Sequence, residues 1–186
     1  ESMCDHPDIK AVAFVGSTKV AKIVYARATA NGKRALCLGG AKNHMIVVPD
    51  ADQDSTAKGL LASSMGSAGQ RCMAASVAVC VSEVDPIIDQ LVEEAKGFKL
   101  GIDMGTIVSK DAYNRILNYI NEAEEMGATI LVDGRNETPP KEYENGYWIG
   151  ATILDHVNPD WPCAKEEIFG PVLSIIRTDT LEDAIK

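Results

Sequence analysis

The residues around Cys72 have the types and spacing expected of a nucleophilic thiol. Residues 66–74 read Gly-Ser-Ala-Gly-Gln-Arg-Cys-Met-Ala, between a helix-like stretch and an apolar, strand-like run. Glycine and alanine let a backbone approach a bound molecule closely, and they leave room around the sulfur. The competing interpretation is a buried, inert thiol, which is the common state of a free cysteine. The small neighbours favour the nucleophile, which attacks as the thiolate.

A second segment suited to chemistry is the Gly-Ser-Thr sequence at residues 16–18. It follows an apolar run and precedes apolar residues at helical spacing, which predicts a strand-to-helix turn. Backbone N–H groups at a helix N-terminus bind anions, and glycine permits close approach. Gly16 and Ser17 are therefore candidates for a phosphate contact. Such turns are common, so without other motifs the sequence favours a purely structural turn.

The elements that would position these residues alternate along the chain. We expect strands at residues 9–15, 34–38, 45–48, 77–81, 129–132, 147–153 and 172–177. We expect helices at residues 20–30, 52–64, 87–96 and 113–126, and a loop or hairpin on the surface at residues 133–146. This alternation predicts an α/β fold with a mainly parallel sheet and flanking helices. The first strand is apolar enough to be buried on both faces, and Ser55 is a candidate cap for the second helix.

Composition excludes several classes of function. The 186 residues carry a formal net charge of −9, which disfavours a nucleic-acid partner. No apolar run approaches the roughly 20 residues that a membrane-spanning helix needs. The odd number of cysteines, without paired spacing, indicates reduced thiols in an intracellular compartment. The three scattered histidines have no spacing typical of a metal site.

Five motifs in order resemble the aldehyde dehydrogenase superfamily over essentially the whole chain. They are Phe-Val-Gly-Ser-Thr at 14–18, Leu-Gly-Gly at 38–40, Asp-Ala-Asp at 50–52, Gly-Gln-Arg-Cys at 69–72 and Glu-Glu-Ile-Phe-Gly-Pro-Val at 166–172. No single motif is decisive, but the five together are specific. The resemblance implies that residues 1–38 are the tail of a dinucleotide-binding domain. It also implies that residues 39–186 form a catalytic domain, incomplete at its C-terminus.

The resemblance implies a role for each site residue. Cys72 would add to an aldehyde carbonyl, a hydride would pass to NAD, and a thioester would remain on the sulfur. The implied cofactor-binding residues are Gly16, Ser17, Leu38, Glu167 and Phe169. Without the flanking motif, Glu167 would be interpreted as a solvated charge and Phe169 as a core aromatic. Ala21 stands where the family often has a glycine, which weakens the fit of the pyrophosphate region.

One departure from the family pattern concerns the fate of the thioester. Hydrolytic members carry a glutamate before Leu-Gly-Gly that activates water, and here Cys37 holds that place. A neutral thiol is a poor general base, so the acyl-enzyme would survive until coenzyme A attacks it. Together with Gly-Ala-Lys-Asn-His at 40–44 and Gly-Gln-Arg-Cys-Met-Ala at 69–74, this resembles the acylating branch, which converts malonate or methylmalonate semialdehyde to acetyl- or propionyl-CoA with loss of CO2. The alternative is a hydrolytic enzyme in which Cys37 is only a small buried residue.

Several further expectations follow from the resemblance. Arg71 is a candidate contact for the substrate carboxylate, and a surface contact or an electrostatic effect on Cys72 are its alternatives. Residues 42–44 belong to a segment after the domain crossing, and no mechanistic role is assigned to them. The second oxyanion donor of the family, an asparagine, would lie upstream, so we expect the isolated chain to be inactive. We expect a homodimer or homotetramer in the mitochondrial matrix or bacterial cytoplasm, and a non-catalytic fragment is a third possibility.

Overall fold

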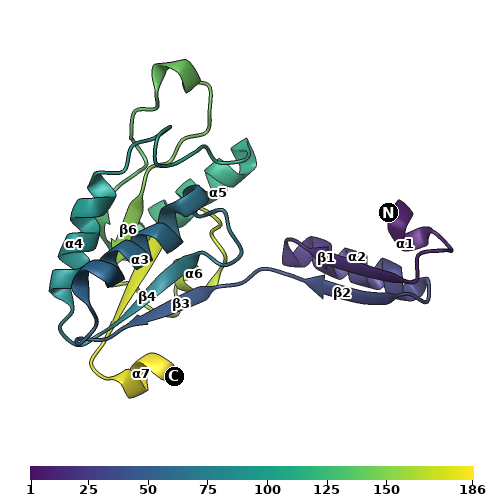
Figure 1. Cartoon of the computed structure of the whole chain (residues 1–186), viewed down its shortest axis with the longest axis horizontal. Helices are drawn as coiled ribbons and strands as arrows, with labels where there is room; N and C mark the ends of the chain where they lie inside the picture. The colour runs from purple at the N-terminus through teal and green to yellow at the C-terminus, as the bar shows by residue number, and fades with distance from the viewer. The chain divides into compact units, whose positions relative to one another are not determined.

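The computed structural model describes all 186 residues and divides into two compact units. The N-terminal unit is Glu1–Ala41 and the C-terminal unit is Lys42–Lys186 (Figure 1). The sequence analysis placed the boundary after Leu38, and the structural division falls between Ala41 and Lys42. Strands and helices alternate in both units, so the α/β class is confirmed.

The N-terminal unit is a single β-α-β motif preceded by one helical turn. Its elements are α1 (Ser2–Asp5), β1 (Ala11–Val15), α2 (Thr18–Ala30) and β2 (Arg34–Leu38). The two strands pair in parallel, with Val15 opposite Leu38. Helix α2 ends at Ala30 with Asn31 as its C-cap, and Gly32 has φ +70°, the left-handed conformation that favours glycine after a helix.

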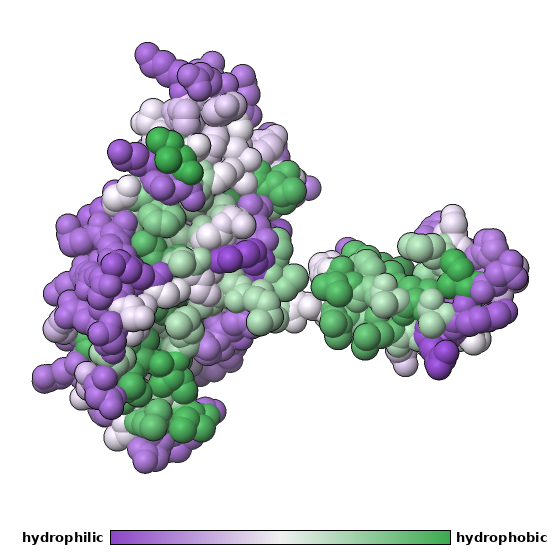
Figure 2. All heavy atoms as spheres, viewed as in Figure 1, coloured by the Kyte–Doolittle hydropathy of each residue, from purple (hydrophilic) through white to green (hydrophobic).

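The expectation that the first strand is buried on both faces is wrong for this unit. Residues of β1 and β2 alternate between exposed and half-buried. Val15 and Leu36 are each 61% exposed, and hydrophobic side chains gather on the surface of the unit (Figure 2). The physical reason is that the sheet has two strands and one covering helix, so one face has nothing packed against it.

The C-terminal unit contains a five-stranded sheet in the order β3-β4-β7-β6-β5. The strands are β3 (Asn43–Val47), β4 (Ala75–Val81), β5 (Thr129–Val132), β6 (Thr152–Asp155) and β7 (Val172–Thr178). Four strands run parallel and β5 pairs antiparallel with β6, which confirms a mainly parallel sheet.

Helices pack on both faces of this sheet (Figure 1). The helical segments are α3 (Gln53–Met65), the 3-10 turn Gly66–Gly69, α4 (Asp85–Lys96), α5 (Lys110–Glu125), the 3-10 turn Lys141–Tyr143, α6 (Pro162–Lys165) and α7 (Leu181–Ile185). Helices α3 and α4 bury Leu60 and Leu91 against one face, and α5 buries Ile116 against the other. Successive β4 residues alternate between these two cores, because side chains along a strand point to opposite faces.

Two local expectations are wrong. The strand expected at residues 147–153 is β6 at Thr152–Asp155, because the preceding backbone turns away where Gly150 donates a hydrogen bond to the Gly134 carbonyl. The cap of α3 is Asp52, whose carboxylate accepts from the Ser55 N–H at 2.8 Å, so Ser55 supplies the donor. An aspartate accepts this hydrogen bond as well as a serine does.

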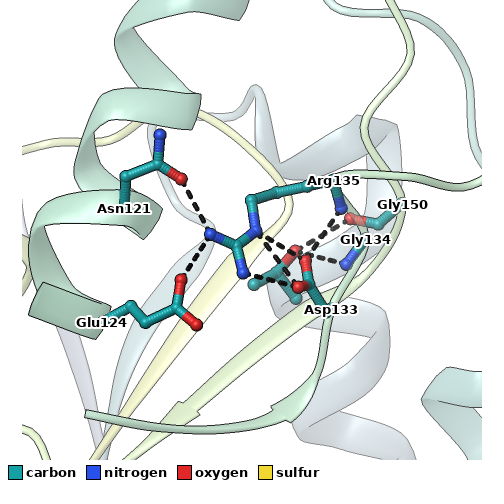
Figure 3. Close-up of polar contacts among 7 residues, drawn as sticks. Asn121, Glu124, Asp133, Gly134, Arg135 and Gly150 are labelled. Carbon is teal, nitrogen blue, oxygen red and sulfur yellow. Dashed lines mark hydrogen bonds and ion pairs between the residues drawn. The ribbon is translucent and has the colours of Figure 1, made fainter. Parts of the chain in front are cut away.

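The loop after β5 is tied to α5 by Arg135, whose side chain is 18% exposed (Figure 3). Its Nη1 donates to Asn121 Oδ1 at 2.8 Å and to Glu124 Oε2 at 2.6 Å. Its Nη2 contacts Asp133 Oδ2 at 2.6 Å. These contacts therefore fix the first residues of the loop against α5.

None of the helices has both the length and the apolar character that crossing a membrane would require.

Candidate active site

Three segments converge where β3, β4 and β7 begin. These strands are parallel neighbours in the sheet, so the residues just before them meet at one edge, here called the amino edge. The segment before β3 contains Lys42. The segment before β4 is the cysteine loop, residues 66–74. The segment before β7 is the glutamate segment, residues 166–171.

The cysteine loop has an unusual backbone. Ser67, Ala68 and Gly69 all have positive φ angles, of 52°, 54° and 66°. This left-handed region is unfavourable for residues with a Cβ, and such strain collects at functional sites. At Gly69 a Cβ would lie 2.0 Å from the Gly170 carbonyl oxygen, so only glycine fits. The cysteine loop and the glutamate segment therefore touch backbone to backbone.

Side-chain amides hold the cysteine loop from two directions. Asn43 Nδ2 donates to the carbonyls of Cys72 at 2.8 Å and Ala74 at 3.0 Å. Gln70 donates through Nε2 to the Thr106 carbonyl at 3.0 Å and accepts from the Val108 N–H at 2.9 Å. These bonds fix the backbone on both sides of the thiol.

Cys72 is the exposed thiol of the chain. Cys4, Cys80 and Cys163 are buried and Cys37 is half-buried. Burial raises the pKa of Cys80 to about 12, and burial also raises the pKa of Cys163. Because the thiolate is the nucleophile, the two buried cysteines are poor candidates. The buried, inert alternative for Cys72 does not describe the thiol in this unit.

Arg71 points back towards the helix that precedes it. Its Nη2 donates to the carbonyls of Ala62 at 2.7 Å and Ser63 at 2.9 Å, in the last turn of α3. It also packs on Gly66, where a Cβ would lie 2.6 Å from Nη2. These contacts give Arg71 a structural role at the end of the helix. No carboxylate of the chain pairs with it, so its charge remains available, and the substrate contact stays a prediction.

Helix α5 holds the glutamate segment. Tyr119 donates its hydroxyl to Glu166 Oε2 at 2.5 Å, and Arg115 donates to the Ile168 carbonyl at 3.1 Å. Burial and the hydrogen bond to Glu166 raise the pKa of Tyr119 to about 12, so the phenol remains a donor. Phe169 has φ 53°, a strained conformation for an aromatic residue. Glu167 is half-buried and takes part in no hydrogen bond or ion pair.

In the N-terminal unit, three predicted cofactor residues lie close together. Gly16 follows β1, and its N–H donates to the Leu38 carbonyl at 3.2 Å. Ser17 is the N-cap of α2, and its side chain makes no capping hydrogen bond. The first turn of a 13-residue helix thus presents N–H groups and a free hydroxyl, a geometry that fits a phosphate.

Cys37 lines an open hollow of about 310 Å³ in the N-terminal unit, together with Thr18, Ala21, Lys22, Tyr25 and Gly39. It is half-buried rather than enclosed in a core. Its thiol can therefore meet solvent in this unit, and no carboxylate lines the hollow beside it.

Sequence reasoning missed Lys42 and Asn43, which were assigned to a structural segment. Asn43 contacts the Cys72 carbonyl, and Lys42 places an amine at the amino edge. Their position directly before an apolar strand was visible in the sequence. That this strand lies beside the one following Cys72 was not, because strand order depends on long-range pairing.

Comparisons with known proteins agree with these motifs. The model of the aldehyde dehydrogenase family matches residues 1–186. The chain is 45% identical over 190 residues to the acylating, mitochondrial methylmalonate-semialdehyde/malonate-semialdehyde dehydrogenase of Rattus norvegicus. It is 42% identical over 194 residues to malonate-semialdehyde dehydrogenase of Pseudomonas aeruginosa. These alignments cover 99% and 100% of the chain but 35% and 39% of the relatives.

A crystal structure from Sinorhizobium meliloti 1021, assigned as a methylmalonate-semialdehyde dehydrogenase and complexed with NAD, superposes with a TM-score of 0.94. It is 48% identical in sequence, and the superposition covers 99% of the chain and 39% of that structure. The chain thus spans between a third and two-fifths of the length of these proteins and belongs to the aldehyde dehydrogenase family.

Proposed function

We propose that the protein carrying this chain oxidises malonate or methylmalonate semialdehyde with NAD and passes the acyl group to coenzyme A, with loss of CO2. The observation that carries this proposal is the Cys72 thiol, exposed on a strained loop and fixed by Asn43 and Gln70. The relatives from Rattus norvegicus and Pseudomonas aeruginosa, named for these semialdehydes, support the substrate class.

The chemistry begins with Cys72. Its thiolate adds to the aldehyde carbon, and the carbonyl oxygen becomes an oxyanion. The backbone N–H of Cys72 donates no backbone hydrogen bond, so it is free to stabilise that oxyanion. The Asn43 side chain holds the Cys72 carbonyl and thereby orients the peptide groups beside the thiol. Loss of a hydride from the same carbon leaves a thioester on the sulfur.

NAD supplies the hydride acceptor when it is bound. In the N-terminal unit, Gly16 and Ser17 would hold its pyrophosphate at the start of α2, and Leu38 would contact it. In the C-terminal unit, Glu167 would accept hydrogen bonds from the ribose diol and Phe169 would pack against the nicotinamide. A free carboxylate suits a diol, because two donors meet two acceptor oxygens.

Transfer to coenzyme A rests on Cys37. A thiol in this position does not activate water as a carboxylate would, so the thioester persists. While the thioester persists, the bond between the α-carbon and the substrate carboxylate breaks, CO2 leaves, and the α-carbon takes up a proton. The coenzyme A thiolate then attacks the carbonyl carbon, the bond to the Cys72 sulfur breaks, and the thiolate of Cys72 is regenerated. Arg71, whose charge no carboxylate of the chain neutralises, is available for the carboxylate of the semialdehyde.

The test is NADH formation from malonate semialdehyde by the protein carrying this chain, with and without coenzyme A. Turnover should require coenzyme A and vanish in Cys72→Ser, whereas Cys4→Ser, which changes a buried thiol outside the site, should remain active. Turnover indifferent to coenzyme A would mean that water attacks the thioester, and the enzyme would be hydrolytic.

The isolated 186-residue chain should form no NADH, because it covers only 39% of the chain of the NAD-complexed relative. Measurable turnover by the isolated chain would contradict this expectation. We further propose that the whole protein is a homodimer or homotetramer and acts in the mitochondrial matrix or bacterial cytoplasm, as light scattering and cell fractionation would establish.

A further inference from the structure

Lys42 is half-buried, and its amine is shielded from solvent without a partner. Its Nζ is the one side-chain nitrogen or oxygen in the chain that is shielded from solvent and makes no hydrogen bond. Removing an ammonium from water is unfavourable unless another group compensates for the lost hydration. Packing alone therefore does not explain why a lysine occupies this position.

Strand order brings Lys42 to the candidate active site. It directly precedes β3, and Asn43, the next residue, reaches the carbonyl of Cys72. The charged and titratable groups that act on the Lys42 ammonium are Cys163 on α6 and the two carboxylates of the glutamate segment, Glu166 and Glu167. The amine thus lies at the amino edge, among groups from α6 and the segment before β7.

Of these three groups, one is free to respond to the ammonium. Glu166 is already bound by the Tyr119 hydroxyl at 2.5 Å. Burial raises the pKa of Cys163, so this thiol carries no charge near neutral pH. Glu167 has no hydrogen bond or ion pair of its own. The unpartnered ammonium and the unpartnered carboxylate are therefore complementary.

We propose that Lys42 is a positioning residue that pairs with the Glu167 carboxylate when NAD binds, and so keeps it ionised and oriented for the ribose diol. The proposal rests on the proposed function, since Glu167 is the ribose-binding group there. Lys42 itself touches neither the substrate nor the reacting carbon. Its ammonium acts through Glu167, while Asn43 beside it orients the peptide of Cys72.

The charge state of Lys42 is compatible with this role. Burial lowers its pKa to about 8, while Cys163, Glu167 and Glu166 act in the opposite direction. Most of the amine is therefore protonated at neutral pH. The ammonium is lost in mildly alkaline solution, so NADH binding should weaken there.

The experiment is a fluorescence titration of NADH into the protein carrying this chain. Lys42→Met keeps the aliphatic stem and should weaken NADH binding by about tenfold, the scale of one charge-assisted contact. Lys42→Arg keeps the charge and should retain most of the affinity. Lys96→Met, which removes an exposed lysine paired with Glu93 on α4, is the matched control and should bind as the wild type does.

A double-mutant cycle separates positioning from a direct contact. Glu167→Gln should weaken NADH binding about as much as Lys42→Met, and the double variant should be no weaker than either one. Additive losses would overturn the proposal, because Lys42 would then act on the nucleotide without Glu167. Unchanged NADH binding in Lys42→Met would overturn it as well.

Thermal unfolding provides a readout that does not depend on activity. Without nucleotide the Lys42 ammonium has no partner, so Lys42→Met measured without NADH should unfold at the same Tm as the wild type or at a higher one. A large fall in Tm, or failure to fold, would show that Lys42 supports the fold and would overturn the positioning role. If the wild type binds no NADH, the proposed function fails first, and this inference fails with it.

Discussion

The two units place their candidate residues at opposite ends of their parallel strands. In the N-terminal unit, Gly16 and Leu38 lie at the carboxyl ends of β1 and β2. In the C-terminal unit, Cys72 and the glutamate segment lie before the amino ends of β4 and β7. Open α/β sheets ordinarily bind ligands beyond the carboxyl ends of their strands. The N-terminal unit follows this rule and the C-terminal unit does not.

The carboxyl edge of the larger sheet is occupied by an ion-pair network. Arg177 of β7 contacts Asp155 Oδ2 and Asp85 Oδ1, each at 2.8 Å. The Asp155 side chain is 3% exposed, and both carboxylates raise the pKa of Arg177. The charged groups of Arg177, Asp155 and Asp85 are thus all paired within the chain.

The amino edge instead combines left-handed backbone, an exposed thiol and an unpartnered amine. Unsatisfied groups on a fixed backbone distinguish a candidate site from a structural network.

The two edges of the sheet can be compared by thiol reactivity, because β4 has one cysteine near each edge. Cys72 precedes the strand and is exposed, whereas Cys80 lies near its end and is buried. With limiting iodoacetamide at pH 8, Cys72 should be alkylated about a hundredfold faster or more, because Cys80 reacts only after local opening. Peptide mapping gives the ratio. Equal alkylation rates of Cys72 and Cys80 would mean that the thiols at the two edges do not differ in accessibility.

Gly69→Ala should strongly disrupt the amino edge. A Cβ would meet the Gly170 carbonyl, and alanine is strained at φ +66°, so the free energy of unfolding should fall by about 3 kcal/mol. Gly59→Ala on α3, where a Cβ meets nothing within 4 Å, should instead stabilise by about 0.5 to 1 kcal/mol. Urea denaturation measures the free energy of unfolding of both variants. Equal stability would mean that the cysteine loop does not need its left-handed conformation.

Asp155→Asn tests the carboxyl edge. It leaves Arg177 with only Asp85 as a charged partner, so the free energy of unfolding should fall by about 2 kcal/mol. The alkylation rate of Cys72 in the folded protein should not change, because the network lies at the other end of the strands. A slower or faster Cys72 in this variant would show that the edges are coupled.

Asn43→Ala should lower the free energy of unfolding less than Gly69→Ala does. It removes two hydrogen bonds to the cysteine loop, and we expect a loss of about 1 to 2 kcal/mol in unfolding free energy. Its effect on kcat in the whole protein should exceed what this loss explains, because the peptide beside Cys72 would no longer be oriented. Gln53→Ala, which removes one exposed hydrogen bond to the Pro86 carbonyl, is the control. An unchanged kcat in Asn43→Ala would assign Asn43 to stability alone.

Much of the secondary structure could be predicted from local patterns. The helices α4 and α5 and the strands β5 and β7 lie where apolar periodicity, Pro86 and turn residues indicated them. The error at β6 arose because residues 147–151 are apolar enough for a strand, but the Gly134–Gly150 backbone contact directs them elsewhere. The exposure of β1 could not be predicted, because burial depends on what packs against a strand.

The residues of the candidate site also divide into those that the sequence indicates and those that only the tertiary structure shows. Cys72, Gly16, Ser17, Glu167 and Phe169 were recognisable because motifs preserve residue types that chemistry requires. The amide of Asn43, the amine of Lys42 and the hydrogen bonds of Arg71 to α3 carry no such local signature. Each depends on which segment lies beside it.

The sequence by itself determined the α/β class, the family motifs and the candidate nucleophile, because periodicity and residue type are local properties. Only the tertiary structure decided which edge of the sheet carries the cysteine loop and which groups there lack a partner. The physical reason is that burial, strand order and hydrogen-bond satisfaction arise from contacts between distant segments. The pairing of β3, β4 and β7 thus brings Lys42, Cys72 and Glu167 to one edge of the sheet.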